Sequence, residues 1–476
     1  MSFFKKHSAV FAIIFSVICY FFFAYFIERT QFYIVSFVWF SLFGGCYLLL
    51  KNNHISFTTL VLIALLFRAI FFFSTPNLSQ DFYRFIWDGR LLLNGLNPYL
   101  SLPETFIQQN IQPIAEAAIL YDGMGELNGS HYTNYPPLNQ LCFFIAALFA
   151  SKSIFGSVLV LRSIIILADL GILYFGKKLL EHLNLPTKNI FWYLLNPFII
   201  IEMTGNLHFE PVMLFFLVWA LYKLQQQKWI FAAILIACSV SVKLIPLIFL
   251  PLFFQWFVRP KVTTKEGKQF KNQTKKAPSL SKRIPNLQIS LKRMAKLFLF
   301  YVIILSISTL LFLPFYDAEL MTKYSSSVSL WFHDFEFNAS FYYLFREIGY
   351  LFRGYNEIAI IGKITPILTI VFLLYLSFFR QNKTSIQLIT AMLFGLCFYY
   401  FTATTVHPWY LATPLILCVF TEYKFPLVWS LVIIFTYQAY VNTPWQENLW
   451  FVFLEYLTVF SFLTYEIIQQ SKKKKM

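Results

Sequence analysis

Three ionisable residues recur at helical spacing in one polar stretch of the chain. Asp81, Arg84 and Asp88 stand three and four positions apart in SQDFYRFIWDGRLLLNGLNPYL, so one face of a helix would carry all three. A carboxylate in such a group can take a proton from a hydroxyl, and an arginine can bind a phosphate. Asp81 also stands at the expected start of the helix, so a capping or first-turn role is the alternative.

Two short turns between apolar runs carry further candidates for substrate binding. His208 and Glu210 lie in GNLHFEP, and His407 and Trp409 lie in HPWY. A histidine can donate to a phosphate, a glutamate can bind sugar hydroxyls, and a tryptophan can stack on a sugar ring. The alternatives are a helix cap for the first turn and anchoring at a membrane interface for the tryptophan.

Lys243 stands inside the apolar run SVKLIPLIFLP, where a charge is costly unless it is paired or used. It is therefore a candidate for binding a phosphate, with extension toward the membrane surface as the alternative. Arg90, Tyr135 and Arg346 complete the predicted set of substrate-binding residues.

Neither a metal nor an organic cofactor is expected. Four of the seven histidines stand near acidic residues in polar turns and loops, but the chain has no HExxH motif. The six cysteines form no CxxC pair and lie in or beside apolar runs, which is typical of small core residues. A metal site is therefore the weaker interpretation of these histidines.

Apolar segments must position all of these residues. Of 476 residues, 58% are hydrophobic and 13% are charged, which is more apolar surface than one soluble core could bury. We expect an all-α, multi-pass integral membrane protein, a bundle of about 13 to 14 spans with a long extracytoplasmic loop that carries amphipathic helices. The predicted spans are 9–27, 32–50, 56–74, 157–176, 189–205, 208–224, 228–245, 246–258, 296–314, 358–379, 385–404, 408–421, 426–442 and 449–468.

The formal net charge of +16 is not spread evenly along the chain. Twelve of the 38 lysines and arginines stand between Arg259 and Lys296, and four more form the tail from Lys472 to Lys475. Anionic membrane lipids are therefore expected partners, and nucleic acid is not. By the positive-inside rule, these basic segments lie in the cytoplasm.

If the N-terminus is cytoplasmic, successive spans cross the membrane in alternating directions, and this assigns each remaining segment to the cytoplasmic or the extracytoplasmic side. The run from Ala9 to Ile27 is kept as a first span, because it is long and no small-residue cleavage pattern follows. Gln140 to Ser151 is treated as a short re-entrant or interfacial helix. The predicted organisation is helices 1–74, an extracytoplasmic catalytic loop 75–156, helices 157–258, a basic cytoplasmic linker 259–295, helices 296–468 with an outward loop 315–357, and a basic cytoplasmic tail 469–476.

Several ordered motifs across most of the chain resemble those of the GT-C superfamily of polytopic glycosyltransferases. They are SQDFYRFIWDGRLLLNGLNPY, NYPPL, NPFIIIEMTGNLHFEP, SVKLIPLIFLP, FNASFYYLFR and HPWYLATPL. The chain most resembles the bacterial mannosyltransferases that use polyprenyl-phosphate sugars. This resemblance implies an acidic general base in the first large outward loop, which is Asp81 here, and inversion at the anomeric carbon. Relatives commonly have two acids where this chain has Gln80 and Asp81, so the departure favours a metal-independent reaction.

The expected function is transfer of a hexose, in particular mannose, from a polyprenyl-phosphate-sugar donor to a lipid or cell-envelope glycan acceptor. We expect the active site on the extracytoplasmic side of the bacterial inner membrane. Two other functions fit many spans and charged outward loops: a transporter or flippase of lipid-linked sugars, and a polymerase or ligase of surface polysaccharide. The transporter gains no support from an internal repeat or from a matched pair of broken helices.

Overall fold

The computed structural model describes residues 2–258, 291–333, 335–442 and 444–475, and within these ranges the chain is helical. Extended backbone pairs there at a single bridge, between Phe337 and Thr405. The predicted all-α class is confirmed.

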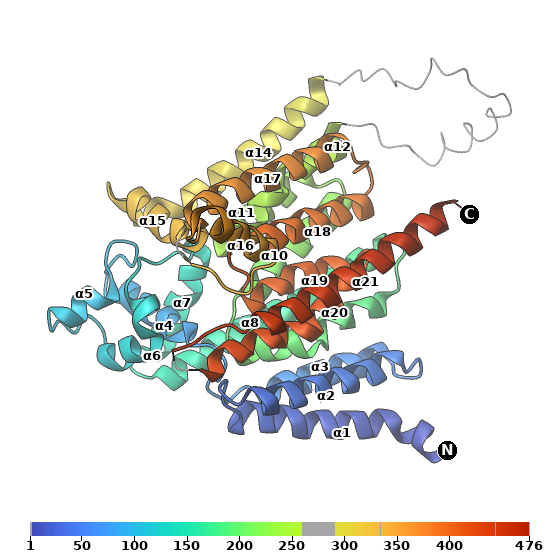
Figure 1. Ribbon diagram of the computed structural model, residues 1–476, viewed down its shortest axis with the longest axis horizontal. Helices are drawn as coiled ribbons and strands as arrows, with labels where there is room; N and C mark the ends of the chain where they lie inside the picture. Colours follow the sequence, from blue (N-terminus) through green and yellow to red (C-terminus); the bar gives the residue numbers. More distant parts are fainter. Residues whose placement is uncertain (1, 259–290, 334, 443, 476) are drawn as a thin grey trace.

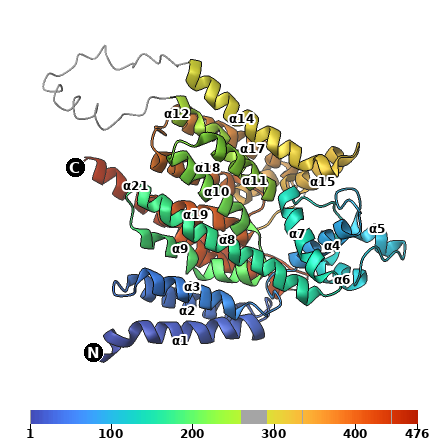
Figure 2. The same cartoon turned by 180° about the vertical axis from the view of Figure 1, so that it is seen from behind.

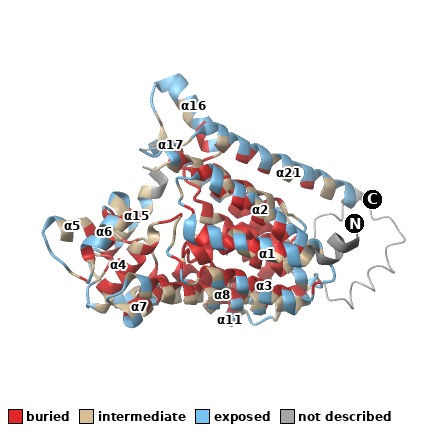
Figure 3. Cartoon of the chain, turned by 90° about the horizontal axis from the view of Figure 1, so that it is seen from below, coloured by how far each residue is buried: buried red, intermediate tan, exposed pale blue. Residues whose placement is uncertain are grey.

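Seven of the described helices are long and apolar enough to cross a membrane. Large apolar side chains cover their outer faces; Phe11, Phe37 and Leu167 are 68%, 73% and 66% exposed. Figure 3 shows such exposed outer faces around a buried centre. This surface suits lipid rather than water, so the chain is an integral membrane protein. The seven helices are α1 (Ser2–Phe26), α2 (Phe32–Lys51), α8 (Ile154–His182), α14 (Leu291–Phe312), α17 (Ile358–Phe378), α18 (Ser385–Thr402) and α21 (Leu449–Lys475).

The other predicted spans are bent or shorter. The π-helical segment η2 (Ile199–Gly205) and α10 (Glu210–Gln225) meet at 112°. Together they are long and apolar enough for one membrane span, which would be a bent span. Prolines start or interrupt several short segments, because proline lacks the backbone donor that continues a helix. The short apolar helices are α3 (Phe57–Ile70), α7 (Pro137–Ala150), α11 (Trp229–Val242), η3 (Ile245–Leu252) with α12 (Phe253–Val258), η6 (Pro408–Leu411) with α19 (Ala412–Val419), and α20 (Phe425–Val432) with η7 (Ile433–Val441).

The two ends of the bundle differ in what they carry. The two predicted outward loops place their helices toward one end, as the views from the front and from behind both show (Figures 1 and 2). The chain termini, the C-terminal end of α12 and the N-terminal end of α14 lie at the opposite end. The basic segment 259–290 falls outside the described residues. The helices of the first loop are α4 (Asp81–Leu93), α5 (Pro103–Gln108), α6 (Ala117–Gly129) and α7, and those of the second are α15 (Leu320–His333) and α16 (Phe341–Arg353).

The charged residues Arg84, Asp88 and Arg90 of helix α4 are buried, as are most of its apolar residues. The helix packs against both α6 and α7. A side chain at Gly89 would not fit, because an added Cβ would lie 2.2 Å from the carbonyl oxygen of Phe143 in α7. Both faces of the helix can be buried because these charged residues find partners within the loop.

Buried arginines fix the helix ends beside this loop. Arg162 of α8 donates to four backbone carbonyls at 2.7 to 3.0 Å, and Arg68 of α3 donates to Asp169 of α8 at 2.8 Å. Two of the Arg162 bonds end on Thr204 and Gly205, at the bend between η2 and α10. The Arg162 contacts hold the turn that carries His208 and Glu210.

Candidate active site

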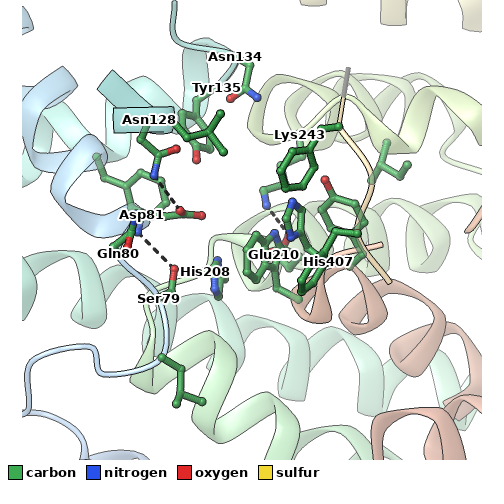
Figure 4. A pocket seen from close by; sticks show the side chains of 18 of the residues that line it. Ser79, Gln80, Asp81, Asn128, Asn134, Tyr135, His208, Glu210, Lys243 and His407 are labelled. Carbon is green, nitrogen blue, oxygen red and sulfur yellow. Dashed lines mark hydrogen bonds and ion pairs between the residues drawn. The ribbon is translucent and has the colours of Figure 1, made fainter. Parts of the chain in front are cut away.

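A cavity of about 590 Å³ lies between the first outward loop and the ends of the membrane helices. The start of α4 and the segment before α7 line one side, and residues at the ends of α10 and α11 and beside η6 line the other (Figure 4). The structure therefore brings together polar residues that are far apart in the sequence. The predicted site residues that line the cavity are Asp81, Tyr135, His208, Glu210, Lys243, His407 and Trp409.

The Asp81 carboxylate points into this cavity (Figure 4). Asp81 is the first residue of α4, and the side chain of the preceding N-cap residue, Gln80, makes no capping hydrogen bond. The Ser79 hydroxyl accepts from the backbone N–H of Asp81 at 3.3 Å, and the Asn128 amide donates to the carboxylate at 3.4 Å. Burial raises the pKa of Asp81 to about 6, although Lys243 and the Asn128 hydrogen bond act in the opposite direction. Asp81 is thus a first-turn carboxylate that is available to a substrate.

Lys243 forms an ion pair with Glu210 at the outer ends of α10 and α11. Glu210 begins α10, and Lys243 directly follows the last residue of α11. The lysine side chain is 21% exposed and the glutamate side chain 3%. Lys243 therefore turns toward a carboxylate in the cavity.

Three rings stack beside this ion pair. The Trp409 indole lies parallel to the His208 imidazole, with centroids 4.0 Å apart, and to the His407 imidazole, with centroids 4.5 Å apart. Burial and the nearby Lys243 lower the pKa of His407 to about 3, so this imidazole is neutral near pH 7. Because the indole takes two parallel ring contacts within the protein, its geometry favours positioning of the histidines over stacking on a sugar.

Sequence reasoning missed Glu202, which lies behind His208. The Tyr437 hydroxyl donates to one carboxylate oxygen of Glu202 at 2.5 Å, and the other oxygen lies 3.7 Å from Nε2 of His208. Glu202 and His208 are almost completely buried. An acid inside the apolar run FIIIEMTG was the signal that could have identified Glu202, since such residues in membrane segments are often functional.

Four predicted substrate-binding residues do not line the cavity, which is a correction to the sequence interpretation. Arg84 pairs with Asp88 at 2.8 Å, and Arg90 pairs with Glu116 at 3.0 Å. Asp88 also accepts from Gln140 at 2.9 Å. Arg84, Asp88 and Arg90 thus find partners inside the loop and do not line the cavity.

Arg346 is the fourth of these residues, and it belongs to a separate group on α16. It pairs with Glu336 at 2.6 Å and with Glu347 at 3.0 Å. Its guanidinium also lies 4.6 Å from the centroid of the Tyr343 ring. Arg346 is away from the cavity because its own loop supplies two carboxylates.

The buried charges of α4 nevertheless support the site. Arg84 donates to the backbone carbonyls of Asn128 and His131, the latter at 3.0 Å. Asn128 in turn donates to Asp81. Arg84 therefore positions the residue that orients the candidate base, although it does not reach the cavity.

The cavity also contains Arg29, which the sequence analysis did not include. It comes from the turn between α1 and α2 and donates to the Gln80 side chain at 3.1 Å.

For the part of the chain that the structure describes, no group of three or more His, Cys, Asp or Glu side chains is arranged to hold a metal ion.

The chain matches the family model "Alpha-(1->6)-mannopyranosyltransferase, N-terminal domain" over residues 20–259, a region that includes Asp81, His208, Glu210 and Lys243. It is 25% identical over 185 residues to alpha-(1->6)-mannopyranosyltransferase A of Mycobacterium tuberculosis (strain ATCC 25618 / H37Rv). That similarity covers 38% of this chain and 34% of the mycobacterial protein. The chain, an all-helical membrane protein with a polar cavity beside Asp81, belongs to the alpha-(1->6)-mannopyranosyltransferase family.

Proposed function

We propose that this chain is a membrane glycosyltransferase that moves mannose from a polyprenyl-phosphate donor to a lipid or cell-envelope glycan acceptor. The observation that carries the proposal is the position of Asp81. Its carboxylate points into a cavity of about 590 Å³, caps no helix, and has a pKa of about 6. A carboxylate with this pKa is ionised near pH 7 and basic enough to accept a proton.

The reaction is a single displacement. Asp81 takes the proton of an acceptor hydroxyl while that oxygen attacks the anomeric carbon of the donor sugar. The bond between the anomeric carbon and the phosphate oxygen breaks, its electron pair leaves with the phosphate, and the anomeric configuration inverts. The phosphate changes from a diester to a monoester and gains negative charge, so donors beside it lower the barrier.

Lys243 and His407 are the donors that we assign to the phosphate in this step. Lys243 carries a positive charge, and the neutral His407 imidazole has one N–H to donate. We assign the sugar hydroxyls to Glu210, His208 and Tyr135, which line the same cavity. Arg84, Asp88, Arg90 and Arg346 have no substrate contact in this proposal.

We place the isoprenoid tail of a lipid-linked donor on the α17 side of the cavity. Tyr399 and Tyr410 line the main cavity and also line a smaller neighbouring cavity. The smaller cavity reaches Gly362, Thr365 and Pro366 of α17. The outer face of α17 carries exposed isoleucines, so an apolar tail could pass from the lipid toward the cavity along this helix.

We place the cavity on the extracytoplasmic face of a bacterial inner membrane. The support is the distribution of charge along the bundle. The lysine-rich C-terminal tail lies at the end opposite the cavity, and basic segments are retained in the cytoplasm. The proposal needs no metal, because cationic and neutral donors of the chain face the departing phosphate.

Product formation by the purified full chain tests the proposal. The chain is mixed with polyprenyl-phosphate mannose and candidate envelope lipids, and products are identified by mass spectrometry. We expect an acceptor heavier by one hexose and release of the polyprenyl phosphate. Movement of lipid-linked sugar across vesicles without any glycosylated product would identify a flippase instead, and products extended by many sugars at once would identify a polymerase.

A further inference from the structure

Arg29 brings to the cavity a positive charge, which acts on the Asp81 carboxyl and lowers its pKa. It lies in the turn between α1 and α2, and among the described residues it forms no ion pair with an acid. Its direct contacts are with neutral groups: it donates to the Gln80 amide oxygen at 3.1 Å, and its guanidinium lies 4.9 Å from the centroid of the Tyr440 ring. A guanidinium has five N–H donors, so most of its hydrogen-bonding capacity remains for another group.

Lys243, the other cationic side chain that lines the cavity, is paired directly with an acid. The Lys243 ammonium contacts the carboxylate of Glu210. Glu210 is the first residue of α10 and is almost completely buried. The charges of these two side chains largely cancel at a distance. Arg29 is therefore the better placed of the two to attract an anion.

Gln80 holds Arg29 without cancelling its charge. The Gln80 amide nitrogen donates to the carbonyl of Met124 at 2.8 Å, which leaves the amide oxygen to face Arg29. A glutamate at this position would lose the bond to Met124 and would form an ion pair with the arginine. The amide thus fixes the guanidinium at the cavity wall with a neutral group as its direct partner.

We propose that Arg29 binds the phosphate of the lipid-linked donor and that Gln80 keeps the guanidinium available to it. This inference rests on the proposed function, and it adds a residue from the α1–α2 turn to the site. The turn joins two membrane-length helices, so its side chain lies near the depth of a lipid headgroup. An arginine can donate two parallel hydrogen bonds to phosphate oxygens, and its charge opposes the negative charge that develops as the sugar leaves.

Binding of farnesyl phosphate, a short polyprenyl monophosphate, tests the assignment without requiring any sugar transfer. The full chain in detergent is titrated with farnesyl phosphate, and with farnesol as the uncharged control. We expect Arg29→Gln to weaken farnesyl phosphate binding by about 10-fold to 100-fold and to leave farnesol binding unchanged. Arg29→Lys should retain more of the affinity, and Gln80→Glu should weaken phosphate binding by about tenfold because it neutralises the arginine.

Arg353→Gln is the matched control, because Arg353 is a 61% exposed arginine on α16 that pairs with Glu357 and does not line the cavity. Its phosphate affinity should equal that of the parent. The thermal unfolding midpoint of each variant is measured alongside, and a comparison is made only between variants with midpoints like the parent's. The Arg29→Lys and Gln80→Glu variants keep the test available if Arg29→Gln does not fold.

The outcomes separate this inference from the proposed function. Equal farnesyl phosphate affinity in the parent and in folded Arg29→Gln overturns the assignment, even if mannose transfer is observed. Arginine-dependent phosphate binding without transfer from any polyprenyl-phosphate sugar overturns the proposed donor reaction and leaves the phosphate site standing. A higher KM of Arg29→Gln for the acceptor alone, with the KM for the donor unchanged, would place the phosphate on the acceptor and would also overturn the assignment.

Discussion

The Asn128 side-chain amide donates a hydrogen bond to the Asp81 carboxylate at 3.4 Å, and this bond connects the end of α6 to the start of α4. The backbone carbonyl of Asn128 accepts from Arg84, which is itself paired with Asp88. A buried ion pair on one helix therefore supports the orientation of the candidate base at the end of the same helix.

Replacement of Asp81 by asparagine should abolish most of the transfer activity. The amide cannot accept the acceptor proton, so kcat should fall by about 10²-fold to 10⁴-fold. The measurement is product formation by variants of equal thermal stability. Asp122→Asn is the control, since Asp122 is exposed on α6 and does not line the cavity. Activity of folded Asp81→Asn at the parental rate would rule out Asp81 as the base.

The activity should depend on pH with an acidic limb near pH 6. Burial raises the pKa of Asp81 to about 6 in the folded protein, and only the ionised form can act as a base. As the pH falls below about 6, kcat/KM should therefore fall about tenfold per unit. The profile is measured with a donor concentration far below KM. A rate that stays constant down to pH 4 would exclude a base with this pKa.

Asn128→Ala should move that limb to higher pH. The hydrogen bond from Asn128 favours the ionised carboxylate and lowers its pKa, so its loss raises the pKa of Asp81 further. The variant should therefore lose activity mainly at acidic and neutral pH and recover it at alkaline pH. The pH profiles of the parent and of the variant are compared. Equal loss at every pH would mean that Asn128 acts by a different route.

Removal of Lys243 alone should lower the stability of the protein more than removal of the charges of both Lys243 and Glu210. Lys243→Met leaves a nearly fully buried carboxylate without its partner and should cost about 3 to 5 kcal/mol. The double variant Lys243→Met with Glu210→Gln should recover much of this stability, because no unpaired charge remains. Unfolding in detergent measures both effects. If the double variant is as unstable as Lys243→Met alone, the loss comes from packing rather than from the charge.

Gly89→Ala should destabilise the first outward loop. An added Cβ would lie 2.2 Å from the carbonyl oxygen of Phe143, so α4 and α7 would have to move apart. Such overpacking typically costs about 1 to 3 kcal/mol. The thermal midpoint should fall, whereas Gly44→Ala on α2 should leave it nearly unchanged, because a Cβ there has no neighbour within 4 Å.

The sequence by itself determined the class of the protein and the region of the site. Hydropathy and basic clusters are local properties, so the helical membrane class could be derived from them, and the structure confirms the class. The motifs identified the family that the comparison confirms. They also identified Asp81, His208, Glu210, Lys243 and His407, all of which line the cavity.

Only the tertiary structure decided which charges face the cavity. Arg84 and Asp88 satisfy each other one helical turn apart, while Arg29 meets Gln80 across 51 positions of the chain and Tyr437 meets Glu202 across 235. Spacing along one helix predicts which side chains share a face, but it does not predict which neighbouring segment covers that face. A charge inside an apolar environment takes the partner that packing supplies, so its role depends on contacts that local sequence does not encode.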